Sequence, residues 1–183
     1  MKPVQFTVLI VSLTLLVSAR AEQKPPSGAW IDYGSMRQFK LPPGGDIPSL
    51  LGAFEYLENE LPKVFVFDFN GDRIEDYLVE SSERLCGTGG CLYSLVDGKT
   101  RKRIGDFFGS PILILDQKIN RYPVIQSYGH LSAESGNFAT YVFDGKKYQI
   151  VATVYVEGKS LDELFKGLSA FKKMKAAASK TGS

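Results

Sequence analysis

Short β-favouring runs recur along most of this chain, and this pattern restricts its fold more than any other feature. Turn signals separate the runs at intervals of about 10 to 15 residues, and two of these signals, Asp97-Gly98 and Asp144-Gly145, are typical of hairpins. We expect strands over residues 64–67, 77–79, 92–96, 111–115, 124–128, 139–143 and 148–156. The segment from Trp30 to Phe39 is expected to add one short strand. Such a series of strands predicts a meander or a small sandwich.

Two segments have helical spacing instead. The first covers residues 49–61, ends before Pro62 and has apolar residues at Leu50, Leu51, Phe54, Leu57 and Leu61. The second opens at Ser160, which can form a capping box with Glu163, and its apolar stripe comprises Leu161, Leu164, Phe165, Leu168 and Phe171. Its last turns carry Lys172, Lys173 and Lys175; such a basic amphipathic helix can bind a membrane surface, but docking on the sheet is the simpler expectation.

These elements predict an α+β fold. We expect one domain over residues 30–175, in which a mainly antiparallel sheet of five to seven strands is covered by the two helices. A flexible leader over residues 22–29 and a disordered tail over 176–183 are expected to flank this domain.

The first 21 residues resemble a secretory signal peptide. Lys2 is followed by an apolar stretch from Phe6 to Val17, which is short for a membrane span, and then by the small-x-small cleavage site Ala19-Arg20-Ala21. Cleavage would start the mature chain at Glu22 and leave 20 basic and 20 acidic side chains. This balance does not favour nucleic-acid binding, and no later segment is long and apolar enough to span a membrane. We therefore expect a periplasmic or secreted protein.

Export makes the two cysteines informative. Cys86 and Cys91 enclose the glycine-rich string GTGG, which lets the chain turn back, so we expect a disulfide in an oxidising compartment. A redox-active pair normally has two intervening residues, and a zinc site lacks further ligands because His130 is the only histidine.

The string DFNGDRIED at residues 68–76 places oxygen-bearing side chains at alternating positions. A tight loop with oxygens at its positions 1, 3, 5 and 9 and a backbone carbonyl at position 7 suits a hard cation such as Ca²⁺. The loop is not an EF-hand, because Arg73 stands where glycine is expected and Val79 replaces the bidentate glutamate. The alternative interpretation is a metal-free polar turn closed by its own side chains.

This loop resembles the calcium-binding hairpins of FG-GAP and VCBS-type repeats over about 12 residues, from Asp68 to Val79. The resemblance implies a β-hairpin but not a whole propeller, since one copy is present. It implies calcium ligands at Asp68, Asn70, Asp72, Ile74 (through its carbonyl) and Asp76. The order of the acidic hairpin, CGTGGC and FDGKKY over residues 63–148 also resembles small exported bacterial proteins with no assigned chemistry.

No coherent catalytic set is visible. His130, Ser132, Glu134 and Ser135 are close in sequence, but proximity is no sign of triad geometry and there is no GxSxG elbow. The glycines of GTGG lack the Lys and Ser or Thr of a phosphate-binding loop. Ser135-Gly136 resembles the start of the SGxxY signature of periplasmic lysozyme inhibitors, but the tyrosine, Tyr141, lies two positions late.

We therefore expect a non-catalytic periplasmic protein that binds another exported protein, as an inhibitor or immunity-type partner. Two alternatives remain open. One is a hydrolase of envelope polymers that uses carboxylates not identified here, and the other is a purely structural protein stabilised by calcium.

Overall fold

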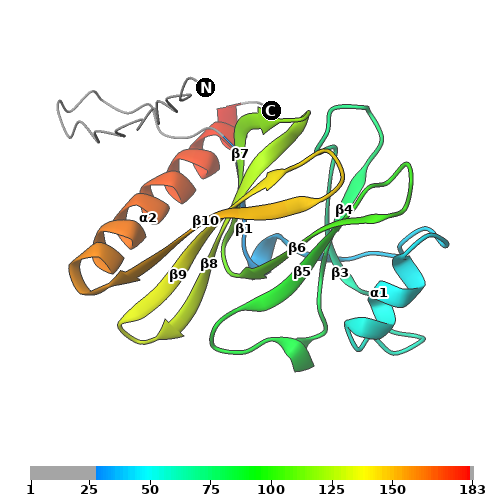
Figure 1. Cartoon of the computed structure of the whole chain (residues 1–183), viewed down its shortest axis with the longest axis horizontal. Helices are drawn as coiled ribbons and strands as arrows, with labels where there is room; N and C mark the ends of the chain where they lie inside the picture. Colours follow the sequence, from blue (N-terminus) through cyan, green and yellow to red (C-terminus); the bar gives the residue numbers. More distant parts are fainter. Residues whose placement is uncertain (1–27, 182–183) are drawn as a thin grey trace, which may run out of the picture.

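A computed structural model describes residues 28–181, and two five-stranded antiparallel sheets form its body (Figure 1). Sheet A has the order β1 (Gly28–Ile31), β7 (Ile112–Ile119), β8 (Tyr122–Ser132), β9 (Ser135–Phe143) and β10 (Tyr148–Glu157). Sheet B has the order β2 (Arg37–Gln38), β3 (Lys63–Phe67), β4 (Asp76–Glu80), β5 (Cys91–Val96) and β6 (Arg103–Gly109). The predicted α+β fold with mainly antiparallel strands is confirmed. The predicted signal peptide and most of the leader lie outside the described residues.

The strand prediction missed β6. Its sequence, RIGDFFG, holds two glycines and an aspartate, so its β-favouring character is weak, and pairing with β5 compensates for it. The segment from Trp30 to Phe39 also differs from the expectation of one strand. It contributes the end of β1 to sheet A and all of β2 to sheet B, with the short 3-10 helix η1 (Tyr33–Ser35) between them. The described residues therefore form ten strands in two sheets, rather than the single sheet of five to seven strands that we expected.

The first helix is shorter than predicted. α1 covers Ile47–Ala53, and Glu55 then takes a left-handed conformation with φ 58°, which ends the helix. The hydroxyl of Tyr56 explains the course of the chain beyond it, since it accepts a hydrogen bond from the amide of Lys63 and donates one to the carbonyl of Glu80, both at 3.0 Å. The predicted extension to Leu61 is therefore wrong, and Leu57 and Leu61 are exposed at the surface.

The C-terminal helix packs on sheet A, as expected. α2 covers Gly158–Thr181 and includes most of the segment predicted as a tail. Leu161, Leu164 and Leu168 contact the sheet, and Lys172 forms a 2.6 Å ion pair with Asp32. The predicted capping box does not form, because the helix begins two residues earlier and the hydroxyl of Ser160 bonds to the backbone of Glu157. Within residues 28–181, no helix is both long and apolar enough to cross a membrane.

The main hydrophobic core lies between the two sheets. Its largest fully buried side chains include Tyr93, Phe69, Phe107, Ile112 and Ile125. A second cluster, with Leu50 and Val79, fills the space between α1 and the other face of sheet B. Each sheet therefore has one face toward the main core and one face toward a helix.

Candidate functional site

The acidic loop joins β3 and β4 as a hairpin, as predicted. Its side chains close the loop on itself, since the carboxylate of Asp68 accepts hydrogen bonds from the amides of Gly71, Asp72 and Arg73 at 2.7 to 3.1 Å. Asp72 in turn accepts from the amide of Ile74 at 2.9 Å. Partial burial opposes ionisation of Asp68, but these bonds from three amides together keep the pKa of its carboxyl below the usual value.

The other two predicted side-chain ligands connect the loop to the body. Asn70 donates through its amide nitrogen to the hydroxyl of Tyr122, which donates to Asp97. Asp76 is buried and accepts from the amides of Phe69 and Gly98 at 3.0 and 2.8 Å. Burial raises the pKa of Asp76 to about 6, and the nearby carboxylates of Asp97 and Asp72 act in the same direction.

The loop retains features of both sequence interpretations. Arg73 has φ 69°, so a residue with a side chain does occupy the left-handed position at which glycine was expected. The carboxylates of Asp68, Asp72 and Asp76 each hold backbone amides, which is the arrangement of a polar turn. Calcium binding at this loop stays a prediction.

The predicted disulfide between Cys86 and Cys91 is present, with a Cα–Cα distance of 4.2 Å. It closes the β4–β5 connection, where Gly87 and Gly90 bond to each other, and the carbonyl of Gly89 accepts a 3.2 Å bond from the amide of His130 on β8. The disulfide therefore closes a loop that contacts sheet A. Among residues 28–181, one set of three His, Cys, Asp or Glu has its ligand atoms within 4.8 Å of one another, namely Glu80, Cys86 and Cys91, and the disulfide occupies both sulfurs.

The residues considered for a catalytic triad are not arranged as one. Nδ1 of His130 lies 3.2 Å from the hydroxyl of Tyr128, while Ser132 and Ser135 bond to each other at 2.8 Å across the β8–β9 hairpin. Glu134 bonds to Ser132 through its backbone amide. Gly136 packs against the ring of Tyr128, and Tyr141 is buried in the main core, so the two parts of the SGxxY-like string face different surroundings.

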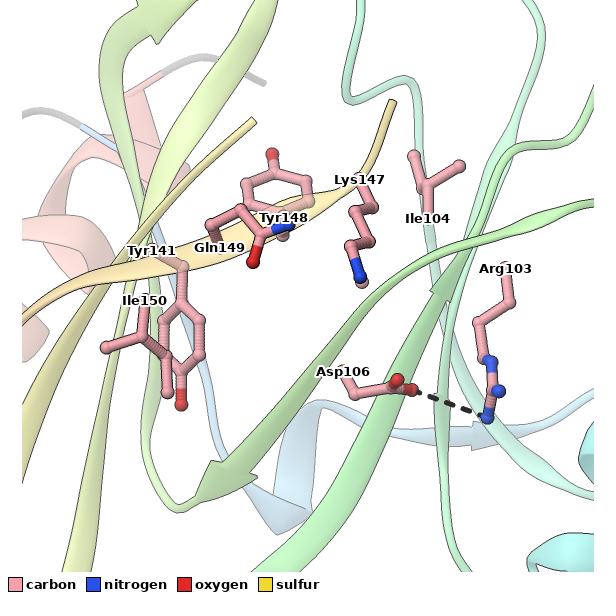
Figure 2. Close-up of a pocket in the computed structure, with 9 residues that line it drawn as sticks. Arg103, Ile104, Asp106, Tyr141, Lys147, Tyr148, Gln149 and Ile150 are labelled. Atoms are coloured by element: carbon pink, nitrogen blue, oxygen red, sulfur yellow. Dashed lines mark ion pairs between the residues drawn. The ribbon is translucent and has the colours of Figure 1, made fainter. Parts of the chain in front are cut away.

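A pocket of about 470 Å³ opens where β6 passes the start of β10 (Figure 2). We call it the β6 pocket, and its lining residues are Arg103, Ile104, Gly105, Asp106, Tyr141, Lys147, Tyr148, Gln149 and Ile150. β6 is an edge strand of sheet B and β10 is an edge strand of sheet A. The pocket therefore lies between the open edges of both sheets.

Two of the three charged side chains in the β6 pocket, Arg103 and Asp106, form an ion pair with each other, and the third, Lys147, does not share in it. Arg103 lies 3.8 Å from Asp106, which also accepts a 2.5 Å hydrogen bond from the buried hydroxyl of Ser94. Lys147 reaches toward the same space from the β9–β10 hairpin (Figure 2), and no carboxylate of the described residues lies within 4.0 Å of its ammonium group. The arrangement suits an anionic group that enters between Lys147 and Arg103.

Sequence reasoning did not find this pocket, because four of its nine lining residues come from β6, the strand that the pattern missed. The string TRKR at residues 100–103 was the available signal, since a run of cations at a hairpin marks a charged surface.

Comparisons with known proteins add no relative: no family model, no curated protein and no solved structure matches this chain.

Proposed function

We propose that this protein is exported and binds another exported protein without catalysing a reaction. The observation that carries the proposal is the β6 pocket, which lies between two open sheet edges. Open edges offer unpaired backbone donors and acceptors, and proteins commonly use them to bind extended polypeptides. The periplasm is the proposed compartment, supported by the signal-like N-terminus and by a disulfide that is consistent with an extracellular location.

The composition of the pocket supports binding over hydrolysis. Glycosidases use two carboxyl groups on either side of the bond they break. Asp106 is the one carboxylate among the residues that line the pocket, and it is already engaged by Arg103 and Ser94. Binding of a partner protein, with this protein as its inhibitor or immunity factor, requires no pair of carboxyl groups.

Site-specific photo-crosslinking in the exporting cells tests the proposal. A photoreactive residue in place of Ile150, which lines the pocket and is 61% exposed, should give a crosslinked adduct with one defined exported protein. The matched control carries the photoreactive residue in place of Glu58, which is exposed near α1. This variant should give no crosslinked adduct. Fragment release from peptidoglycan by the purified protein, abolished by Asp106→Asn, would instead support the hydrolase.

A further inference from the structure

Sheet B covers only part of the inner face of sheet A. Tyr141 and Ala139 of β9 point toward the main core, and the β10 residues paired with them, Ile150 and Thr153, share that face. Tyr155, paired with Asn137, lies on the same face further along the strand. Yet Ile150 and Tyr155 are 61% and 55% exposed, and Thr153 is exposed as well. An apolar part of the inner face therefore lacks a covering strand within residues 28–181.

Strand β6 forms the boundary of the covered region. Gly105 lies so close to Tyr148 of β10 that a side chain at this glycine would meet the Tyr148 Cβ at 2.9 Å. Further on, Phe107 packs edge-on against Tyr141 of β9 with ring centroids 5.0 Å apart. The next residues reach β8, where the amide of Ser110 donates to the carbonyl of Tyr128. β6 thus crosses β10, β9 and β8 in turn, and the exposed residues of β10 lie beyond it.

The β6 pocket is adjacent to this uncovered part of the inner face. Ile150 belongs both to the exposed part of the inner face and to the lining of the pocket. Neighbouring strands in a sheet lie about 4.8 Å apart, so a strand added to β6 would extend over the inner face toward Tyr155. The backbone edge of β6 and the apolar residues beyond it are therefore placed to be covered by the same added strand.

Charge limits which strand would fit. Lys147 and Arg103 line the pocket, and Lys102 and Lys146 are exposed directly beside them in the chain. The one carboxylate of the lining, Asp106, is held by Arg103 and by Ser94. An added strand with acidic side chains would find complementary charge here, whereas a basic strand would be repelled.

We propose that an extended segment of the partner, with alternating apolar and acidic side chains, adds to sheet B as a sixth strand beside β6. Its apolar side chains cover Ile150 and Tyr155, and its carboxylates lie against Lys147 and Arg103. This inference rests on the proposed function, since it specifies how the partner binds at the β6 pocket.

Synthetic peptides test the inference on the purified full chain. The probe is an end-capped eight-residue peptide of alternating valine and glutamate, and its analogue carries lysine in place of every glutamate. The acidic peptide should bind at least about tenfold more tightly than the lysine analogue. Lys147→Glu should remove this preference, whereas Lys166→Glu, an equal charge change at an exposed position of α2, should leave it intact. An acidic peptide with methylated backbone nitrogens along one edge should not bind, because strand pairing requires those amides.

Amide hydrogen exchange identifies the strand that pairs. Bound acidic peptide should protect amides of β6 beyond Arg103, whose own amide already donates to Asp46, and leave those of 151–155 unchanged. Protection of β10 alone, or equal binding of both peptides, would overturn the inference. If neither peptide binds while a photoreactive residue at position 150 still crosslinks a partner, the proposed function stands and the added strand is wrong.

Discussion

The hydroxyl of Tyr93 donates a 2.9 Å hydrogen bond to the carboxylate of Glu80, and both residues are 1% exposed. Burial raises the pKa of the Glu80 carboxyl, although the bond from Tyr93 and the ammonium of Lys63, 3.9 Å away, both oppose the shift. The same burial, together with the charge of Glu80, raises the pKa of Tyr93, which remains a donor. The pair therefore contributes a defined pH dependence to stability.

The folded protein holds the Glu80 proton more strongly than the unfolded chain does, so the free energy of unfolding should fall as pH rises above 4.5, the ordinary value for this carboxyl. Glu80→Gln keeps an acceptor for Tyr93 and removes the charge, so it should make this fall smaller. The part of the fall that comes from Asp76, whose pKa is also raised, should remain. At about pH 8 the variant should be more stable by about 1.4 kcal/mol for each unit of the raised pKa. Urea denaturation at about pH 4 and about pH 8 measures the effect. Glu83→Gln, which removes an exposed carboxylate bound to the same Lys63, is the control and should retain the fall.

Calcium should bind saturably at the acidic loop in calorimetry on metal-stripped protein, and a double variant, Asp68→Ala with Asp72→Ala, should lose this binding. Arg73→Gly should tighten binding, because it relieves a side chain at φ 69° and removes a positive charge from the site. Asp144→Ala is the matched control, since it removes another turn carboxylate that holds two backbone amides. No heat of binding up to millimolar calcium would leave the polar turn as the only interpretation.

Reduction of the Cys86–Cys91 bond should lower the free energy of unfolding by about 2 kcal/mol, since the closed loop is short. Denaturation with and without a reducing agent measures the loss, and a double variant, Cys86→Ser with Cys91→Ser, should show no response to the reagent. The amide of His130 should also exchange faster after reduction, because its acceptor lies in the closed loop. Free thiols in the exported protein would contradict the prediction.

Lys172 of α2 forms an ion pair with Asp32 and lies over the ring of Trp30 at 5.4 Å. Burial opposes ionisation of Asp32, but hydrogen bonds from Lys172 and Trp30 lower its pKa to about 2. The stabilisation is therefore present above the ordinary pKa of 3.8 and lost as pH falls toward 2. Lys172→Met should cost less than about 1 kcal/mol, because the pair is solvent-exposed on the lysine side.

The emission of Trp30, the only tryptophan, reports this contact directly. Its spectrum should change with Lys172→Met and not with Lys173→Met, a neighbouring exposed lysine. Identical spectra for the two variants would show that Lys172 does not contact Trp30.

Mass spectrometry of the protein isolated from its native cells should find an N-terminus at Glu22, as the signal-peptide prediction requires. Retention of Met1 would contradict the signal-peptide prediction.

Local signals account for the parts of the fold that the sequence predicted. The Asp144-Gly145 turn and its flanking strands were identified correctly because side chains of adjacent residues determine a hairpin. β6 was missed because its two glycines weaken the local signal, and its place depends on pairing with β5. The end of α1 was misplaced for a similar reason, since the contacts of Tyr56 come from residues distant in sequence.

The β6 pocket could not be predicted from local patterns, because it depends on how one sheet crosses the other. The close approach of Gly105 to Tyr148 joins residues 43 positions apart, and no periodicity in either segment indicates it. The disulfide could be predicted because its two cysteines are close in sequence.

Strands β1 and β2 follow one another in the chain but belong to different sheets. Sheet B is built from one continuous stretch, residues 37–109, so it can assemble from neighbouring hairpins. In sheet A, by contrast, β1 can pair only after β7 has been synthesised, with Trp30 opposite Leu113. During synthesis, the N-terminal strand is thus made early and used late. Losing residues 28–31 would leave sheet B whole but bare the edge of β7, so a short N-terminal truncation would favour aggregation through a strand made much later in the chain.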